Sequence, residues 1–113
     1  VIIPAPYWVS YPDMTLLAGG KPVFVNCSSE TNFKLTAEAL QKVITKNSKW
    51  LILNSPSNPT GSCYSLSELE EIANVVRKHE NLYVMTDDIY EYIVYDNFKF
   101  YTLAIYFNHF FLN

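Results

Sequence analysis

The apolar residues of this chain fall either in short continuous runs or at helical spacing. Runs rich in Val, Ile, Leu and Phe occupy residues 1–3, 21–26, 50–53 and 82–85, and they predict buried strands. Helical spacing is found over residues 11–17, 36–44 and 65–78. Strands that alternate with helices of this length are typical of a parallel sheet with right-handed crossovers, so the sequence predicts the α/β class.

Local signals mark the ends of these helices. Gly19 and Gly20 are typical of a helix C-terminus and would end the first helix. Thr36 can cap the second helix, and Ser65 with Glu68 forms the capping-box pattern that starts the third. Residues 93–95 and 98–101 could add a small hairpin.

Composition narrows the class of protein. With 113 residues, of which 50% are hydrophobic and 17% charged, the chain can form one globular core. The net charge of −3 and only eight scattered Lys and Arg residues argue against a nucleic-acid partner. The sole arginine, Arg77, is flanked by Lys78, His79 and Glu80, and we expect it to be a surface residue.

The cysteines and the apolar runs indicate the setting of the protein. Cys27 and Cys63 have neither metal-ligand spacing nor the density of a disulfide framework, and no signal peptide precedes them, which favours a reduced, cytoplasmic setting. No apolar run approaches the roughly 20 residues that cross a bilayer. The sequence opens on Val1 without a Met, so we expect an upstream part to be missing from it.

Polar and aromatic residues follow three of the predicted strands. Trp8 comes after the first, Asn58-Pro59-Thr60-Gly61 after the third, and Asp87-Asp88-Ile89-Tyr90 after the fourth. Because ligands of open α/β sheets bind outside the carboxyl ends of the strands, these residues predict half of a cofactor site. Taken singly, each has a plainer interpretation: a strand-to-helix turn, a carboxylate that caps a turn, a packed Tyr90 and a Trp8 in the core.

Three segments carry a family resemblance. They are Pro6-Tyr7-Trp8-Val9-Ser10-Tyr11-Pro12, the Asn-Ser-Pro-Ser-Asn-Pro-Thr-Gly loop at 54–61 and Asp87-Asp88-Ile89-Tyr90-Glu91. In order and spacing they resemble class I, fold-type I aminotransferases that depend on pyridoxal phosphate, bacterial aspartate aminotransferases above all. The resemblance covers about residues 1–104 and implies a fragment of the three-layer, parallel-sheet large domain. Residues 105–113 depart from the family, and His109 among them is not expected to be catalytic.

The resemblance also implies roles for four residues toward pyridoxal 5′-phosphate. Asp87 would pair with the pyridine nitrogen, because a neighbouring anion favours the protonated ring. Asn58 and Tyr90 would hydrogen-bond the 3′ oxygen, and Trp8 would stack on the ring. Asn58 would also face the substrate carboxylate. The substrates implied are an amino acid of the aspartate or glutamate type and a 2-oxo acid, and the parent enzyme is expected to be a homodimer.

No catalytic residue of the family is identified in this chain. None of its seven lysines lies in the Ser-x-x-Lys context of the Schiff-base lysine, so we expect the isolated chain to be inactive. Two other interpretations stay open from the sequence. One is a stand-alone α/β module that binds a ligand or partner, although no Gly-rich phosphate loop supports it. The other is a truncated gene product without a function.

Overall fold

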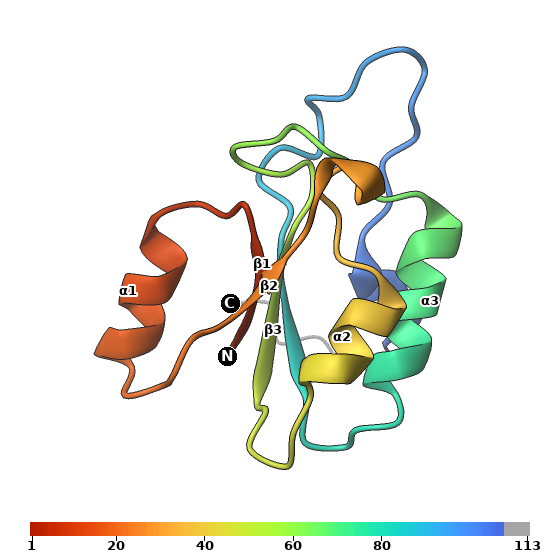
Figure 1. Ribbon diagram of the computed structural model, residues 1–113. Helices are drawn as coiled ribbons and strands as arrows, with labels where there is room; N and C mark the ends of the chain where they lie inside the picture. Colours follow the sequence, from red (N-terminus) through yellow and green to blue (C-terminus); the bar gives the residue numbers. More distant parts are fainter. Residues whose placement is uncertain (108–113) are drawn as a thin grey trace.

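The structure is a computed structural model in which residues 1–107 are described, and its centre is a parallel sheet of four strands in the order β2-β1-β3-β4 (Figure 1). The strands are β1 (Ile2–Ala5), β2 (Val23–Asn26), β3 (Trp50–Asn54) and β4 (Tyr83–Asp87). The helices are α1 (Ser10–Leu17), α2 (Ala37–Val43) and α3 (Leu66–Val76), with the short 3-10 helices η1 (Ser29–Thr31) and η2 (Leu103–Tyr106). The predicted α/β class is confirmed.

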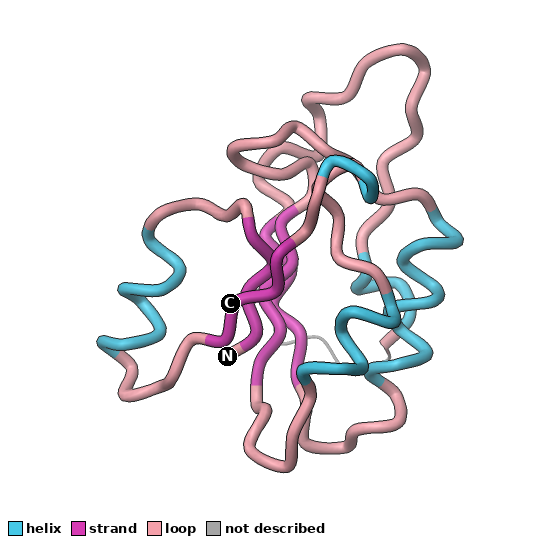
Figure 2. The backbone as a smooth tube through the Cα atoms, viewed as in Figure 1, coloured by secondary structure: helices cyan, strands magenta, loops and turns pink. Residues whose placement is uncertain are grey.

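The sheet lies between two helical layers. Helix α1 covers one face, whereas α2 and α3 cover the other (Figures 1 and 2). The larger core lies under α2 and α3 and includes Leu40, Leu51 and Ile72, which are fully buried. A smaller core under α1 is built on Ile3, Tyr11 and Ile52. Alternate residues of β3 thus serve opposite cores, which explains why this strand is a continuous apolar run.

The predicted helix starts are confirmed. The Thr36 side chain accepts a hydrogen bond from the Ala39 N–H at 3.2 Å. At the start of α3 the Ser65 hydroxyl accepts from the Glu68 N–H at 3.3 Å, and the Glu68 carboxylate accepts from the Ser65 N–H at 2.7 Å. Gly19 has a φ of +74° directly after α1, a conformation that glycine adopts without strain.

The predicted hairpin at 93–95 and 98–101 is wrong, because residues 88–107 contain no strand. A tight turn does form: Asp96 and Asn97 have positive φ, and the Phe98 N–H donates to the Tyr95 carbonyl at 3.0 Å. The flanking segments do not pair, and Tyr92 and Tyr95 are strongly exposed. A two-stranded hairpin whose aromatic side chains are largely exposed is at best marginally stable in water.

The chain continues along α3 after residue 102. The Tyr106 hydroxyl donates to the Leu66 carbonyl at 3.1 Å, and the Arg77 guanidinium lies 5.5 Å from the centre of the Tyr106 ring. Arg77 is exposed, as predicted. The expected boundary between residues 1–104 and 105–113 stays a prediction, and His109 lies outside the described residues.

The capping box generates a test of stability. Changing Ser65 to Ala leaves the Glu68 N–H without its acceptor, so we expect the free energy of unfolding to fall by about 1 kcal/mol. Urea denaturation followed by circular dichroism measures it. Ser29→Ala is the matched control, because Ser29 is exposed and no hydrogen bond of its side chain is found among residues 1–107. Equal denaturation midpoints for the two variants would contradict a stabilising cap.

Candidate functional site

The carboxyl end of the sheet contains a topological switch point. The chain leaves β1 for β2 on one side and later returns to β3 on the other side of β1. Strand β1 pairs with β2 at four positions, and β3 with β4 at five, but β1 and β3 are paired only at Ile2 and Leu51. The ladder between β1 and β3 therefore does not reach the carboxyl ends of the strands, where a crevice lies between the segments that follow them. Such a crevice is where open α/β sheets bind ligands.

A narrow cavity of about 20 Å³ lies in this crevice. Pro6 and Tyr7 line it from the segment after β1, and Asn54 and Asn58 line it from the β3 side. Tyr11 of α1 also contributes to the wall. The cavity thus lies where the sequence places its polar strand ends.

Asp87, the last residue of β4, is held by a hydrogen bond across the sheet. The Tyr11 hydroxyl donates to the Asp87 Oδ2 atom at 2.5 Å. Burial raises the pKa of Tyr11 well above its ordinary value, and the Asp87 carboxylate raises it further. Within residues 1–107 the Asp87 side chain has no ion pair, and the Tyr11 phenol is its hydrogen-bond donor.

Asn54, the last residue of β3, connects the two polar loops. Its Nδ2 atom donates to the Asp87 carbonyl at 2.7 Å, and its Oδ1 atom accepts from the Asn58 N–H at 2.7 Å. Asn54 and Asp87 are also register partners of the β3–β4 ladder. One amide group therefore links the end of β4 to the loop that follows β3.

Two aromatic rings follow β1 in the direction of this site. The Trp8 indole packs edge-on against the Tyr11 ring, with a centroid distance of 5.6 Å, and its side chain is 42% exposed. Tyr7 stacks on Phe24 of β2 at 5.0 Å. Trp8 belongs to neither core cluster and is partly exposed, so it does not lie in a core formed by residues 1–107. The core interpretation of this residue is wrong.

The loop that contains Asn58 is closed by its own backbone. The Gly61 N–H donates to the Ser57 carbonyl at 2.8 Å, and the Ser57 N–H donates to the Ser62 carbonyl at 3.0 Å. Gly61 has a φ of +72°, so this turn favours glycine. The peptide bonds before Pro56 and Pro59 are cis. The loop holds Asn58 half-buried at the cavity wall.

Tyr90 lies beside the other three predicted residues rather than among them. It lines a wider groove of about 720 Å³ between the 56–63 loop and the 90–98 loop. Ser57 and Ser62 border both this groove and the narrow cavity. Tyr90 is also near enough to Tyr11 to be the smallest of the causes that raise the Tyr11 pKa. Trp8, Asn58 and Asp87 are connected through Tyr11 and Asn54, and Tyr90 flanks them.

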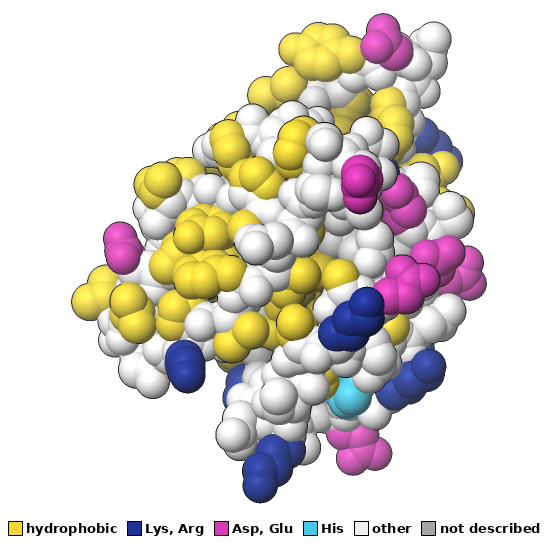
Figure 3. Space-filling model, viewed as in Figure 1, with side chains coloured by type: hydrophobic (Ala, Val, Ile, Leu, Met, Phe, Trp, Pro, Cys, Tyr) yellow, Lys and Arg dark blue, Asp and Glu magenta, His cyan; other side chains and the backbone are white. Residues whose placement is uncertain are grey.

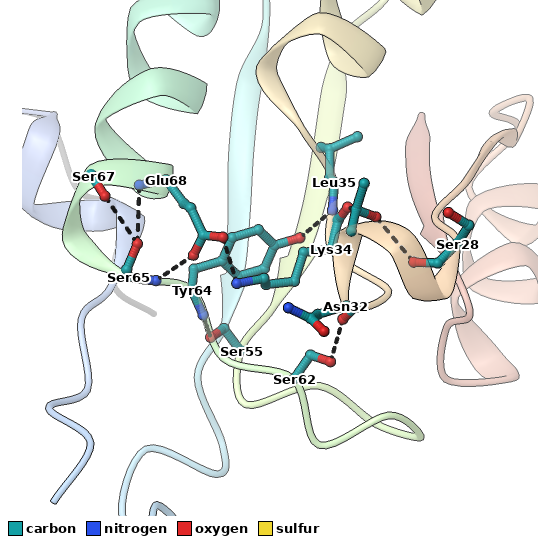
Figure 4. Close-up of polar contacts among 11 residues, drawn as sticks. Ser28, Asn32, Lys34, Leu35, Ser55, Ser62, Tyr64, Ser65, Ser67 and Glu68 are labelled. Carbon is teal, nitrogen blue, oxygen red and sulfur yellow. Dashed lines mark hydrogen bonds and ion pairs between the residues drawn. The ribbon is translucent and has the colours of Figure 1, made fainter.

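A polar network connects the residues that lie between the narrow cavity and the wider groove (Figure 4). The Lys34 ammonium pairs with the Glu68 Oε1 atom at 2.5 Å and lies over the Tyr64 ring. The Tyr64 hydroxyl accepts from the Leu35 N–H at 2.8 Å, and the Ser62 hydroxyl donates to the Asn32 carbonyl at 2.6 Å. The segment after β2 is thereby fixed to the start of α3.

The electrostatics of this network follow from burial and pairing. Burial alone would raise the pKa of Glu68, but hydrogen bonds from Lys34 and Ser65 outweigh it, and the pKa is lowered. Burial raises the pKa of Asp88, against the opposing effect of the Thr102 and Thr86 hydroxyls.

The cysteines and the other potential metal ligands form no metal centre in the part of the chain that is described. Cys27 and Cys63 are both free thiols whose pKa is raised by burial. Residues 1–107 contain no group of three or more His, Cys, Asp and Glu side chains that could hold a metal ion. No helix in the same range is long and apolar enough to cross a membrane.

Sequence reasoning missed two residues of the site, Tyr11 and Asn54. The sequence places Tyr11 on a helix face and in a segment that carries the family resemblance, but it gives no sign of its hydroxyl partner, which is 76 positions away. Asn54 was assigned only to the loop, although it carries a usable signal: a polar amide directly after an apolar strand, four residues before Asn58.

Comparisons with known proteins agree with this geometry. The family described as aminotransferase class I and II matches residues 1–112. A probable aspartate/prephenate aminotransferase of Rickettsia bellii is 69% identical over 104 residues, which are 92% of this chain and 26% of the relative. The aspartate/prephenate aminotransferase of Cereibacter sphaeroides is 57% identical over the same shares of the two chains.

A solved structure supports the same assignment. The aspartate aminotransferase of Rhizobium meliloti superposes with a TM-score of 0.90 at 45% identity, over 93% of this chain and 26% of that one. The chain thus spans about a quarter of the length of the relatives it matches. Both the sequence match and the structural match cover nearly all of this chain. This chain belongs to the class I and II aminotransferases.

Proposed function

We propose that the strand-end site binds pyridoxal 5′-phosphate, and that this chain is the part of an aminotransferase that holds the cofactor ring. The observation that carries the proposal is the Asp87 carboxylate, fixed at the sheet edge by Tyr11 and Asn54. The whole enzyme would move an amino group between an amino acid and a 2-oxo acid. The bound cofactor would supply an electron sink for the carbanion formed at the substrate Cα.

The donor set fits such a ring. Tyr11 engages only the Oδ2 atom of Asp87, and no hydrogen bond from residues 1–107 reaches Oδ1, which can accept from a protonated pyridine nitrogen. The partly exposed Trp8 indole offers a flat surface for stacking. Asn58 and Tyr90 supply an amide and a phenol for an oxygen substituent. The 20 Å³ cavity is too small to enclose a ring, so the chemistry of the donors carries the fit.

Tyr11 keeps the Asp87 carboxylate in place through its own protonation state. Because burial and Asp87 both raise the pKa of Tyr11, the phenol is a neutral donor throughout the neutral range. A neutral donor orients the carboxylate without cancelling its negative charge. We propose that this leaves Asp87 free to act as the counter-ion of the cofactor ring.

The names of the relatives guide the proposal on substrates. Relatives in Rickettsia bellii and Cereibacter sphaeroides are named for aspartate and prephenate, and the Rhizobium meliloti enzyme for aspartate. We propose a substrate of the aspartate or glutamate type, a homodimeric parent enzyme and a cytoplasmic location. The isolated chain, which has no Ser-x-x-Lys lysine, is expected not to catalyse transamination.

Ligand binding by the isolated chain tests the proposal. We expect it to bind pyridoxine 5′-phosphate, which lacks the aldehyde and so cannot react with surface lysines. Asp87→Ala should weaken binding by about tenfold or more, because a hydrogen bond to a charged group contributes about 1.5–3 kcal/mol. Isothermal titration calorimetry measures the affinity. Asp13→Ala, which removes an exposed carboxylate of α1, is the control. Equal affinities in the two variants would refute the role of Asp87.

A second test is the activity of the isolated chain. Incubation of the chain with pyridoxal 5′-phosphate, aspartate and 2-oxoglutarate should yield glutamate no faster than the free cofactor alone does. The reason is that none of its lysines lies in the Ser-x-x-Lys context of the Schiff-base lysine. Turnover by the purified chain that Asp87→Ala abolishes would overturn this expectation.

The raised pKa of Tyr11 predicts a dependence of stability on pH. A phenol with a folded pKa above its ordinary 10.0 stabilises the fold fully below about pH 10, and this contribution is lost as the pH rises further. Burial raises the pKa of Tyr64 too, with the same sign. We expect the free energy of unfolding to fall above about pH 10.

Two variants isolate the contribution of Tyr11 to this fall. Asp87→Asn removes the negative charge that raises the Tyr11 pKa, and Tyr11→Phe removes the phenol itself. Both should make the loss of stability at high pH less steep than in the wild type. Urea denaturation over a series of pH values measures the slope, and identical slopes in all three proteins would argue against the Tyr11–Asp87 interaction.

A further inference from the structure

The orientation of the Asn54 side chain is fixed by two backbone groups. A backbone N–H can only donate and a carbonyl can only accept, so the Asn58 N–H requires Oδ1 and the Asp87 carbonyl requires Nδ2. Both distances are 2.7 Å. No ambiguity between the oxygen and the nitrogen of this amide remains.

The two backbone groups lie where the β3–β4 ladder ends. Asn54 and Asp87 are its last register pair, and beyond them the chains enter separate loops. Backbone groups that are removed from water need partners, and here the ladder no longer supplies them. The Asn54 amide replaces the next step of the ladder with one donor and one acceptor.

We propose that Asn54 is a positioning residue that sets the separation of Asn58 and Asp87, a claim that rests on the proposed function. Asn58, in the loop after β3, and Asp87, at the end of β4, would approach the same ring, and a small error in their spacing would prevent both from binding it at once. Among similar side chains, Asp has the acceptor but no donor, Ser has a shorter reach, and Ala has neither group.

Two variants separate the two hydrogen bonds of the Asn54 side-chain amide. Asn54→Asp keeps an acceptor for the Asn58 N–H and loses the donor to Asp87, whereas Asn54→Ala loses both. By NMR hydrogen exchange, the Asn58 amide should stay protected in Asn54→Asp and exchange faster by about tenfold or more in Asn54→Ala, in line with the loss of a net hydrogen bond. In the wild type, one Asn54 side-chain amide proton should itself exchange slowly.

Affinity for pyridoxine 5′-phosphate provides the functional readout. Both variants should bind about tenfold more weakly than the wild type, because each frees Asp87 from the amide. Asn47→Asp is the matched control: Asn47 is exposed in the turn before β3, and the same change of charge there should leave both the affinity and the Asn58 exchange unaltered.

The outcomes distinguish this inference from the proposed function. If the wild type does not bind pyridoxine 5′-phosphate, the cofactor proposal fails, and the exchange data still decide whether Asn54 fixes Asn58. Rapid exchange of the Asn54 side-chain amide in the wild type overturns the inference without any variant, even if Asn54→Ala does not fold. Unchanged Asn58 exchange in Asn54→Ala, or unchanged affinity in Asn54→Asp, would overturn it as well.

Discussion

The hydrogen bond from Tyr11 to Asp87 is the interaction on which the rest of the site depends. It joins α1, which follows β1 in the chain, to the end of β4. Strand β3 lies between β1 and β4 in the sheet, so the hydrogen bond spans three strands. The small core of Ile3, Tyr11 and Ile52 beneath it packs α1 onto the sheet, so the phenol reaches Asp87 from a packed helix. A carboxylate at the edge of a sheet would otherwise be free to change rotamer. Here its direction is determined by the fold.

Much of the fold followed from local patterns, and part of the site did as well. The strands, the caps at Thr36 and Ser65 and the placement of Asn58 and Asp87 at strand ends depend on neighbouring residues, and the structure agrees with them. The hairpin does not form, although the turn at Asp96 and Asn97 does, because the apolar residues before the turn stay largely exposed and supply little burial to support strand pairing. Tyr11 and Asn54 were missed because their partners are distant in sequence. The cofactor roles of Trp8, Asn58, Asp87 and Tyr90 stay predictions.

The two faces of the sheet are covered unequally. The face under α2 and α3 holds the larger core, whereas α1 alone covers the other face. Apolar side chains gather on the surface over α1 and the neighbouring edge of the sheet (Figure 3). Leu16, Leu17 and Phe24 are among those exposed. On the α1 side of the site, fewer apolar side chains of residues 1–107 are therefore buried than on the side of α2 and α3.

The single register pair between β1 and β3 also determines which site residues share a ladder. The ladder divides the sheet into two paired ribbons, β2–β1 and β3–β4, which one register pair joins. Asn58 follows β3 and Asp87 ends β4, so both belong to the β3–β4 ribbon, whereas Trp8 follows β1 and belongs to the other. The spacing of the two polar groups is therefore set within one ribbon, whereas the position of the indole relative to them depends on how the two ribbons pack. The Tyr11 phenol, from the helix that follows β1, donates to Asp87 at the end of β4 and so links the two ribbons at their carboxyl ends.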